Sequence, residues 1–313
     1  MSGRVGSASA VVFAYHDVGV RCLSVLLAYG VRVPLVVTHE DDPKEQIWFG
    51  SVRKLAELHG IPVVAPEDPN AGDLAQRVAA LKPDFLFSFY YRFMLGGPFL
   101  QAPTRGALNM HGSLLPKFRG RVPVNWAIIH GERQTGASVH YMQMKPDAGD
   151  LVDQQAVPIL PDDTAQQVFN KVTLAAEMVL DRSLPQLVLG TASRRPLDLR
   201  AGSYYGRRRP EDGRVDWAKP AWAVHNLIRA VAPPYPGAYS KADGKPLRLL
   251  LSHYPDQAAK HKAAVLYSDS GRCYADCGDG KRVEILRLEL DGRTLDAAQF
   301  ARDHGAKPLS LGD

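Results

Sequence analysis

The first part of the chain alternates short apolar runs with longer amphipathic stretches. Short apolar runs bounded by turn residues predict buried strands, and apolar residues that recur every three or four positions predict helices. The alternation is typical of repeated β-α-β units, so we predict a doubly wound, mostly parallel sheet with helices on both faces. The expected strands are Val11–Tyr15, Val31–Thr38, Ile61–Ala65, Phe85–Phe89, Gly106–His111, Thr135–Met142 and Leu151–Ile159, and the expected helices are Gly19–Tyr29, Lys44–His59, Ala75–Leu81 and Thr164–Leu189, the last bent or ended late at Pro185.

The pattern changes in the second part of the chain. Arg, Gly, Ser and Pro dominate between Ala192 and Arg214, a composition typical of a solvated connection between domains. A helix is predicted over Ala221–Val231, and several short strands with glycine-containing turns follow, which favours a small OB-like β-barrel of five Greek-key strands. We therefore expect an α/β domain over residues 1–203 and an OB-like domain over residues 204–313. The expected barrel strands are Leu247–Ser252, Ala264–Tyr267, Arg272–Cys277 and Arg282–Leu290.

Composition and charge exclude several classes of protein. The 313 residues include 38 Lys and Arg against 33 Asp and Glu, a net charge of +5, which helps to hold an anionic substrate but falls short of a nucleic-acid-binding signature. The three cysteines form no C-x-x-C pair, so we expect no metal site. The first β-α turn, Ala14 to Gly19, lacks the G-x-G-x-x-G pattern of a dinucleotide site. No apolar run approaches the roughly 18 residues of a membrane span, and Met1–Ala10 is too brief for a signal peptide, so we expect a cytoplasmic protein.

One segment, Gly106 to Arg121, combines an apolar strand with a loop rich in glycine, proline and basic residues. Because side chains alternate along a strand, Asn109 and His111 are expected on the same face at its C-terminal end, where open α/β sheets bind ligands. An amide can donate a hydrogen bond to an acyl oxygen that becomes an oxyanion, and an imidazole can take the proton of an attacking amine. N-x-H alone is a weak motif, but its chemistry fits acyl transfer to an amine.

A second polar element runs from Lys145 to Asp150, after the strand expected to end near Met142. A carboxylate within reach of His111 would orient the imidazole and stabilise its protonated form. Asp147 or Asp150 could fill this role, and a turn aspartate before a hairpin glycine is the alternative interpretation of either residue.

Three motifs in this order resemble the folate-dependent formyltransferase family: Asn109-x-His111, Ser113-Leu114-Leu115-Pro116-x-x-Arg119-Gly120 and Asp147-Ala148-Gly149. In that family the Asn stabilises the transition state, the His transfers the proton and the Asp tunes the His. The resemblance therefore implies that Asn109, His111 and Asp147 are catalytic, and it chooses Asp147 over Asp150. It also implies a Rossmann-like core and 10-formyltetrahydrofolate as co-substrate without a metal, held by Phe93, Met94, Leu95, Arg121, Gln143, Met144, Lys145, Pro146 and Asp147.

The resemblance covers nearly the whole chain and points to one branch, the UDP-4-amino-4-deoxy-L-arabinose formyltransferases of lipid A modification, which is linked to resistance to polymyxin and other cationic peptides. It implies that the acceptor is a small UDP-amino sugar, which is formylated at its 4-amino group. It also implies that the protein has no nucleic acid partner and does not insert into a membrane. Whether the protein forms a homo-oligomer stays open. Many relatives carry a NAD-dependent decarboxylase half that acts on UDP-glucuronate, and we expect only the transferase half here. The supporting segments are Val11–Asp17, Phe87–Arg92, His111–Lys117, Tyr205–Arg208, His225–Asn226, Arg229–Ala232 and Tyr235–Ala238.

Rival functions remain. A methionyl-tRNA formyltransferase would share the motifs but need a more basic surface for RNA, and a formyltetrahydrofolate hydrolase would use water as the acceptor. A non-catalytic sugar-nucleotide module would be expected to lose one of the three polar residues.

Other polar residues have two interpretations. Asp17 is slightly favoured as a helix N-cap over a substrate contact. Lys117 and Arg119 belong either to a solvated basic loop or to an anion site, and for Arg121 we favour the functional interpretation. Packing is the preferred role of Tyr90, Tyr91 and Trp126, and a structural role is preferred for His39, His130, His140 and His225.

Overall fold

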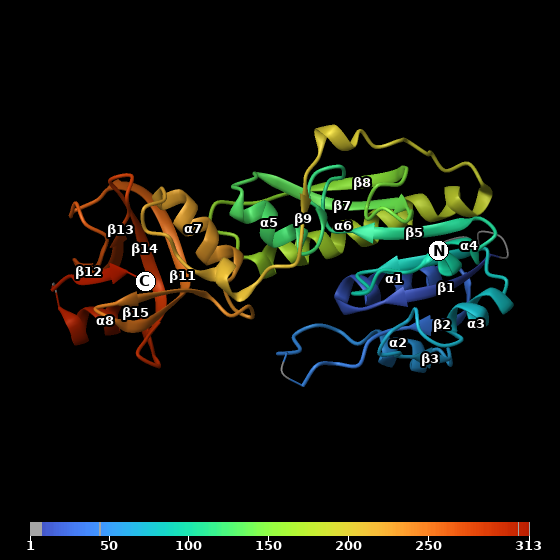
Figure 1. Ribbon diagram of the computed structural model, residues 1–313, viewed down its shortest axis with the longest axis horizontal. Coiled ribbons are helices and arrows are strands. Elements are labelled where there is room, and N and C mark those ends of the chain that lie inside the picture. Colours follow the sequence, from blue (N-terminus) through green and yellow to red (C-terminus); the bar gives the residue numbers. More distant parts are fainter. Residues whose placement is uncertain (1–7, 44, 306, 313) are drawn as a thin grey trace. The chain divides into compact units, whose positions relative to one another are not determined.

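The computed structural model describes residues 8–43, 45–305 and 307–312, which form two compact units (Figure 1). The chain passes between the units more than once, and the last passage lies at Gly206. The domain boundary expected at residue 203 stays a prediction. The first unit comprises Met1–Pro123, Thr135–Val157 and Asn170–Gly206, and the second comprises Val124–Gln134, Pro158–Phe169 and Arg207–Asp313.

A seven-stranded sheet forms the centre of the first unit, in the order β3-β2-β1-β4-β5-β7-β8. The pairs from β3 to β5 are parallel, whereas β7 runs antiparallel to β5. The predicted doubly wound, mostly parallel sheet is confirmed. Its strands are β1 (Ser9–Ala14), β2 (Arg32–Val37), β3 (Val63–Val64), β4 (Phe85–Phe89), β5 (Gly106–His111), β7 (Gln134–Tyr141) and β8 (Leu151–Pro158).

Apolar side chains on both faces explain why the inner strands are buried. Phe13 and Leu86 lie in a core with Val78 of α3 and Phe99 of α4, whereas Phe87 points to the opposite face and is also fully buried. On that face α1 packs on β1 and β4. Helices α1 and α6 are joined by an ion pair between Arg21 and Glu177 (2.6 Å). The helices of the first unit are α1 (His16–Ala28), α2 (Val52–Leu58), α3 (Leu74–Ala80), α4 (Gly97–Gln101) and most of α6 (Ala165–Leu189), which contains Pro185. Helix α5 (Pro123–Ile129) belongs to the second unit except for its first residue.

Two predicted features near the first helices are wrong. Helix α2 begins at Val52, because the Ser51 side chain caps it by accepting the backbone N–H of Lys54; the expected start, Lys44, lies outside the described residues. Asp17 is not an N-cap, since Tyr15 occupies that position. The Asp17 carboxylate instead accepts the backbone N–H of Gly50 (2.7 Å).

The second unit contains an antiparallel barrel that closes through six strands in the order β11-β10-β16-β12-β13-β14, with β14 pairing back to β11. The OB-like barrel is confirmed, but it has six strands and not five, and two of them, the short β10 and β16, were not among the four strands named from the sequence. Helix α7 packs on β11, and α8 covers β12 and β13. The elements are α7 (Ala221–Ala230), β10 (Ala238–Ala242), β11 (Lys245–Ala258), β12 (Val265–Asp269), β13 (Arg272–Asp276), β14 (Lys281–Leu290), β15 (Arg293–Asp296), α8 (Ala297–His304) and β16 (Leu309–Gly312).

The connection before the barrel is more ordered than its composition suggests. It contains β9 (Tyr204–Tyr205), which pairs in parallel with β6 (Arg119–Gly120), and two 3-10 turns, Leu199–Ala201 and Pro210–Gly213. The connection is solvated as expected, since residues 192–212 are exposed or partly exposed, but it carries these short ordered elements. Among the described helices, none combines the length and apolarity needed to cross a membrane.

Candidate active site

The sheet brings the C-terminal ends of β1, β4 and β5 to one edge. Phe89 of β4 is opposite Met110 of β5, and the backbone N–H of Tyr15, just after β1, donates to the Phe89 carbonyl (3.0 Å). The strand order reverses between β1 and β4, which makes this edge the topological switch point where open α/β sheets bind ligands. His111 is the last residue of β5 and therefore lies at that edge.

Asn109, His111 and Asp147 meet at this edge. The Asp147 carboxylate is 3.6 Å from Nδ1 of His111 and accepts a hydrogen bond from Nδ2 of Asn109 (3.3 Å). It also accepts the backbone N–H of Gly120 (2.8 Å), which lies in the loop after β5. Asp150, by contrast, pairs with Arg194 (3.6 Å). The geometry thus brings Asp147, and not Asp150, to the histidine.

The hydrogen bonds of His111 define which ring nitrogen carries its proton. Nε2 lies 2.8 Å from the carbonyl oxygen of Phe118, and a carbonyl can only accept, so Nε2 is the donor. In the neutral imidazole Nδ1 is then unprotonated and faces Asp147. Because His111 is only 6% exposed, the ring has little freedom to exchange these partners for water. Nδ1 is therefore the nitrogen that can take up a proton, and Asp147 is its counter-ion.

The ionised state of Asp147 is strongly stabilised. Burial raises the pKa of a carboxylic acid, but positive charge on the nearby rings of His111 and His140 and the hydrogen bond from the backbone N–H of Gly120 outweigh that effect and hold the pKa of Asp147 below its ordinary range. Asp147 is thus a carboxylate at neutral pH, as the counter-ion of an imidazolium must be.

His140 was expected to be a structural histidine, but it belongs to the same cluster. Its Nδ1 donates to the Tyr141 carbonyl (2.9 Å), so Nε2 is an acceptor in the neutral ring, 3.3 Å from Nδ2 of Asn109 and 3.4 Å from Asp147. His140 is 1% exposed and directly opposite Asn109 in the antiparallel β5–β7 pair. The sequence gives no signal for this contact, because it depends on the register between two strands.

Family comparison agrees with this geometry. The family described as "Formyl transferase" matches residues 24–184, and the one described as "Formyl transferase, C-terminal domain" matches residues 208–305. The chain belongs to the formyl transferase family. The chain is therefore a formyltransferase. Its sheet domain and its barrel correspond to the two matched families.

Three solved structures share the fold of this formyltransferase. An N-formyltransferase from Helicobacter canadensis in complex with folinic acid and dTDP-3-aminofucose is 18% identical, with 90% of this chain and 99% of that chain covered and a TM-score of 0.72. WlaRD, a sugar 3N-formyl transferase in the presence of dTDP and 5-N-formyl-THF, is 16% identical over 90% and 97%, with a TM-score of 0.71. HypX from Aquifex aeolicus in complex with tetrahydrofolic acid is 20% identical over 93% and 46%, with a TM-score of 0.63.

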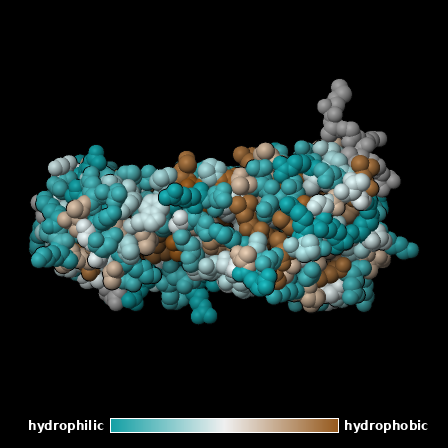
Figure 2. All heavy atoms as spheres, turned by 90° about the horizontal axis from the view of Figure 1, so that it is seen from above, coloured by the Kyte–Doolittle hydropathy of each residue, from teal (hydrophilic) through white to brown (hydrophobic). Residues whose placement is uncertain are grey.

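The residues expected to hold the folate lie on two neighbouring loops of the formyltransferase. Phe93, Met94 and Met144 are 42%, 49% and 68% exposed, which is unusual for large apolar side chains. The two loops are close to each other, since the Met144 sulfur lies 4.0 Å from the position that a Cβ on Gly97 would take. The side chain of Leu95 is buried in the core, so only its backbone can face a ligand. The face drawn in Figure 2 is mostly hydrophilic, with apolar side chains gathered in a few groups. Five further predicted residues are exposed or partly exposed: Arg121, Gln143, Lys145, Pro146 and Asp147.

The basic residues of the loop after β5 differ in exposure. Arg119, expected to be either solvated or an anion ligand, is only 8% exposed, so the solvated alternative is wrong for it. Lys117 and Arg121 are exposed, and the backbone N–H of Arg121 donates to the Tyr205 carbonyl (2.9 Å). Within the described residues, no group of three or more His, Cys, Asp or Glu is arranged to hold a metal ion.

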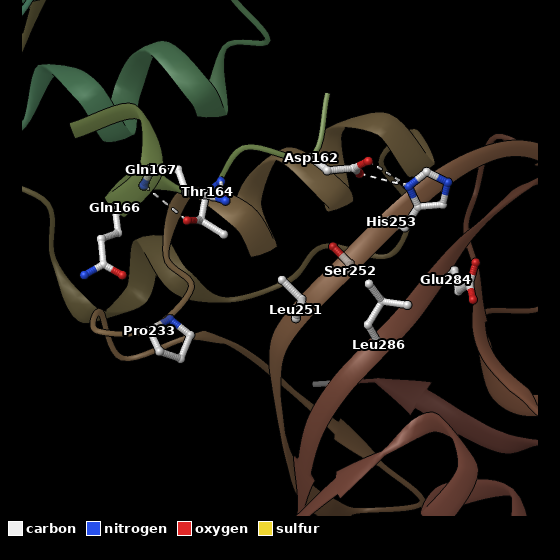
Figure 3. A pocket seen from close by; sticks show the side chains of 10 residues that line it. All are labelled: Asp162, Thr164, Gln166, Gln167, Pro233, Leu251, Ser252, His253, Glu284 and Leu286. Carbon is white, nitrogen blue, oxygen red and sulfur yellow. Dashed lines mark hydrogen bonds and ion pairs between the residues drawn. The ribbon is translucent and has the colours of Figure 1, made fainter. Parts of the chain in front are cut away.

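A hollow of about 560 Å³ lies in the second unit and contains none of the predicted site residues (Figure 3). Its charged groups already have partners: Asp162 is 2.9 Å from Nδ1 of His253, and Glu284 is 3.4 Å from Arg272. Exposed Leu251 adds an apolar wall. Since the three motif residues lie elsewhere, the candidate active site is not assigned to this hollow. Its lining residues are Asp162, Thr164, Gln166, Gln167, Pro233, Leu251, Ser252, His253, Glu284 and Leu286.

Proposed function

We propose that this formyltransferase moves the formyl group of 10-formyltetrahydrofolate to the 4-amino group of UDP-4-amino-4-deoxy-β-L-arabinose, the reaction used in lipid A modification. The observation that carries the proposal is the meeting of Asn109, His111 and Asp147, from β5 and the loop after β7, in a chain of this family. An amide donor, an imidazole and its carboxylate are the groups that acyl transfer to an amine requires.

Two observations support a folate donor. Phe93, Met94 and Met144 present exposed apolar surface on the loops that carry the predicted folate residues, which suits the flat aromatic rings of a folate. Similar folds have been solved with folinic acid, 5-N-formyl-THF and tetrahydrofolic acid. Those ligands belong to the other proteins, and for this chain they support the proposal by likeness of fold.

In the proposed mechanism the deprotonated amine attacks the formyl carbon, and a new C–N bond forms while the carbonyl electrons move to oxygen. Asn109 donates a hydrogen bond to that oxyanion; its two present partners, Asp147 and His140, are both at 3.3 Å and therefore weak competitors. Nδ1 of His111 takes the proton of the attacking amine, and Asp147 stabilises the imidazolium. The bond between the formyl carbon and the folate nitrogen then breaks, and His111 returns the proton to that nitrogen.

The switch point between β1 and β4 supports a nucleotide-sugar acceptor. Aromatic rings gather there: His16 stacks on Phe49 (3.8 Å between centroids) and lies edge-on to Trp48 (4.6 Å). Burial, and next the charge of Arg92, lower the pKa of His16 to about 3, so this ring is a neutral surface at physiological pH. The Arg92 side chain is 44% exposed and forms two hydrogen bonds to the Glu45 carboxylate (2.7 Å each), a pair that a diphosphate would have to displace to bind this cation. Similar folds have been solved with dTDP and dTDP-3-aminofucose, which are nucleotide ligands of the same class.

Release of tetrahydrofolate tests the proposal. The purified chain is incubated with 10-formyltetrahydrofolate and with UDP-4-amino-4-deoxy-L-arabinose, a dTDP-amino sugar, methionyl initiator tRNA or no acceptor. Release with the UDP sugar that is abolished by His111→Ala and kept by the exposed control His59→Ala supports it. Release only with the dTDP sugar would change the acceptor, release only with tRNA would indicate the alternative methionyl-tRNA formyltransferase, and release without any acceptor would indicate a hydrolase.

A further inference from the structure

Residues 202–205, which we call the strap, contact residues 113–121, the loop after β5. This loop contains Phe118, whose carbonyl accepts a hydrogen bond from His111. The strap and the loop approach closely at two glycines: a Cβ on Gly202 would lie 2.1 Å from the Pro116 carbonyl oxygen, and a Cβ on Gly120 would lie 2.1 Å from the Tyr205 carbonyl oxygen. Strap and loop are therefore fitted backbone to backbone, with no room for a side chain between them.

One residue of the strap holds both peptide groups that flank Phe118. The backbone N–H of Phe118 donates to Oγ of Ser203 (2.9 Å), and the backbone N–H of Arg119 donates to the Ser203 carbonyl (3.0 Å). Between these two bonds Phe118 has φ 54°, a left-handed conformation that is unfavourable for a residue with a bulky side chain. The Tyr205 ring also stacks on the Phe118 ring (5.5 Å, 18°).

The orientation of Phe118 determines where its carbonyl points. That carbonyl accepts a hydrogen bond from Nε2–H of His111 (2.8 Å), which keeps the proton of the neutral ring on Nε2 and leaves Nδ1 able to take up a proton beside Asp147. A strained residue persists only when its surroundings fix it, and here Ser203 fixes it on both sides. We propose that Ser203 is a positioning residue for His111: it holds Phe118 in its left-handed conformation and so selects the tautomer of His111 that is protonated on Nε2. This inference rests on the proposed catalytic role of His111.

The test compares Ser203→Ala, which removes the Oγ acceptor, with Ser203→Thr, which keeps it, and with the control Ser193→Ala, an exposed serine of the same connection. The loss of one hydrogen bond corresponds to roughly a 3- to 10-fold effect. We expect kcat of Ser203→Ala to fall by that factor while KM for both substrates changes by less than about 2-fold. Ser203→Thr and Ser193→Ala should keep nearly full kcat.

A second measurement reports on the ring itself. In ¹⁵N spectra of histidine-labelled protein, assigned with His111→Ala, Ser203→Ala should reduce the fraction of His111 protonated on Nε2, and Ser203→Thr should restore it. An unchanged tautomer in Ser203→Ala overturns the inference. So does a Ser203→Ala variant with the kcat of the unsubstituted protein, provided that His111→Ala is inactive. An active His111→Ala together with a shifted tautomer in Ser203→Ala would instead refute the catalytic role of His111 and leave the positioning contact established.

Discussion

Replacing Asp147 by asparagine isolates the charge of one carboxylate oxygen at the candidate site. Asparagine has nearly the same shape, and its side-chain oxygen can still accept the backbone N–H of Gly120, which Asp147 holds at 2.8 Å. What is lost is the negative charge beside Nδ1 of His111 at 3.6 Å, together with the acceptor of the long hydrogen bond from Asn109 (3.3 Å). The variant therefore removes the counter-ion of the imidazolium that forms when His111 takes the amine proton.

The size of the effect follows from the distance. Two unit charges 3.6 Å apart interact by roughly 4.6 kcal/mol at an effective dielectric constant of about 20. The asparagine dipole retains part of this interaction, so a loss of about 3–4 kcal/mol of transition-state stabilisation is the working value. Since about 1.4 kcal/mol corresponds to a factor of ten in rate, kcat should fall by about 10²- to 10³-fold.

Single-turnover formyl transfer measures this step without a contribution from product release. The matched control is Asp150→Asn, the same substitution in the same loop, which removes only a half-exposed ion pair with Arg194 and should change the rate by less than about 3-fold. Circular dichroism checks that both variants fold. If Asp147→Asn keeps more than a third of the normal rate, or if Asp150→Asn is as slow as Asp147→Asn, the assignment of Asp147 as the counter-ion is wrong.

Three further predictions concern other groups. His140→Ala should lower kcat about 10-fold because it removes a neighbour of both Asn109 and Asp147; steady-state kinetics at saturating substrate checks this, and an unchanged kcat contradicts it. Phe93→Ala should raise KM for 10-formyltetrahydrofolate by roughly 5-fold and leave kcat unchanged, whereas the exposed Leu58→Ala should alter neither; initial rates at varied folate measure both. Burial lowers the pKa of His225 from 6.5 to about 4, so the unfolded chain binds a proton that the folded chain does not, and stability should fall as pH drops from about 6.5 to 4, by at most roughly 3 kcal/mol for this residue. Thermal denaturation at several pH values should show a shallower fall for His225→Gln, and equal slopes would contradict the prediction.

The sequence predicted the sheet well because its signal is local. β4 and β5 end at the predicted residues, Phe89 and His111, since both strands are apolar runs bounded by turn or polar residues. The start of α2 was missed because it depends on Ser51, a cap that stands inside a longer amphipathic stretch. β16 was missed because it is short and finds its place only by pairing with the distant strands β10 and β12. β10 forms a hairpin with β11 across the Asp243-Gly244 turn, a local signal that the prediction did not use.

The candidate site was predictable in its residues and not in its network. Asn109 and His111 follow from strand alternation, and the geometry places Asp147 beside them as the motif resemblance implied. Two further residues of the network, His140 and Ser203, could not be predicted from the sequence. His140 reaches the site through strand register, and Ser203 reaches Phe118 through a parallel pairing of two very short strands. Neither kind of contact has a periodic pattern, so residue types alone could not reveal it.

Part of the backbone strain of the described residues lies where the proposed chemistry takes place, and this argues that the site is fixed before substrate binds. Four residues around the switch-point edge have positive φ although none is glycine, at a cost of about 1–2 kcal/mol each. Contacts between segments hold two of them: Asp147 by Gly120 and Asn109, and Phe118 by Ser203. Groups that are fixed in this way need not reorganise as charge develops, which is the condition under which an oxyanion donor and an ion pair lower a barrier most. The strained residues are His16 (66°), Tyr90 (58°), Phe118 (54°) and Asp147 (48°), and each follows a different strand of the sheet.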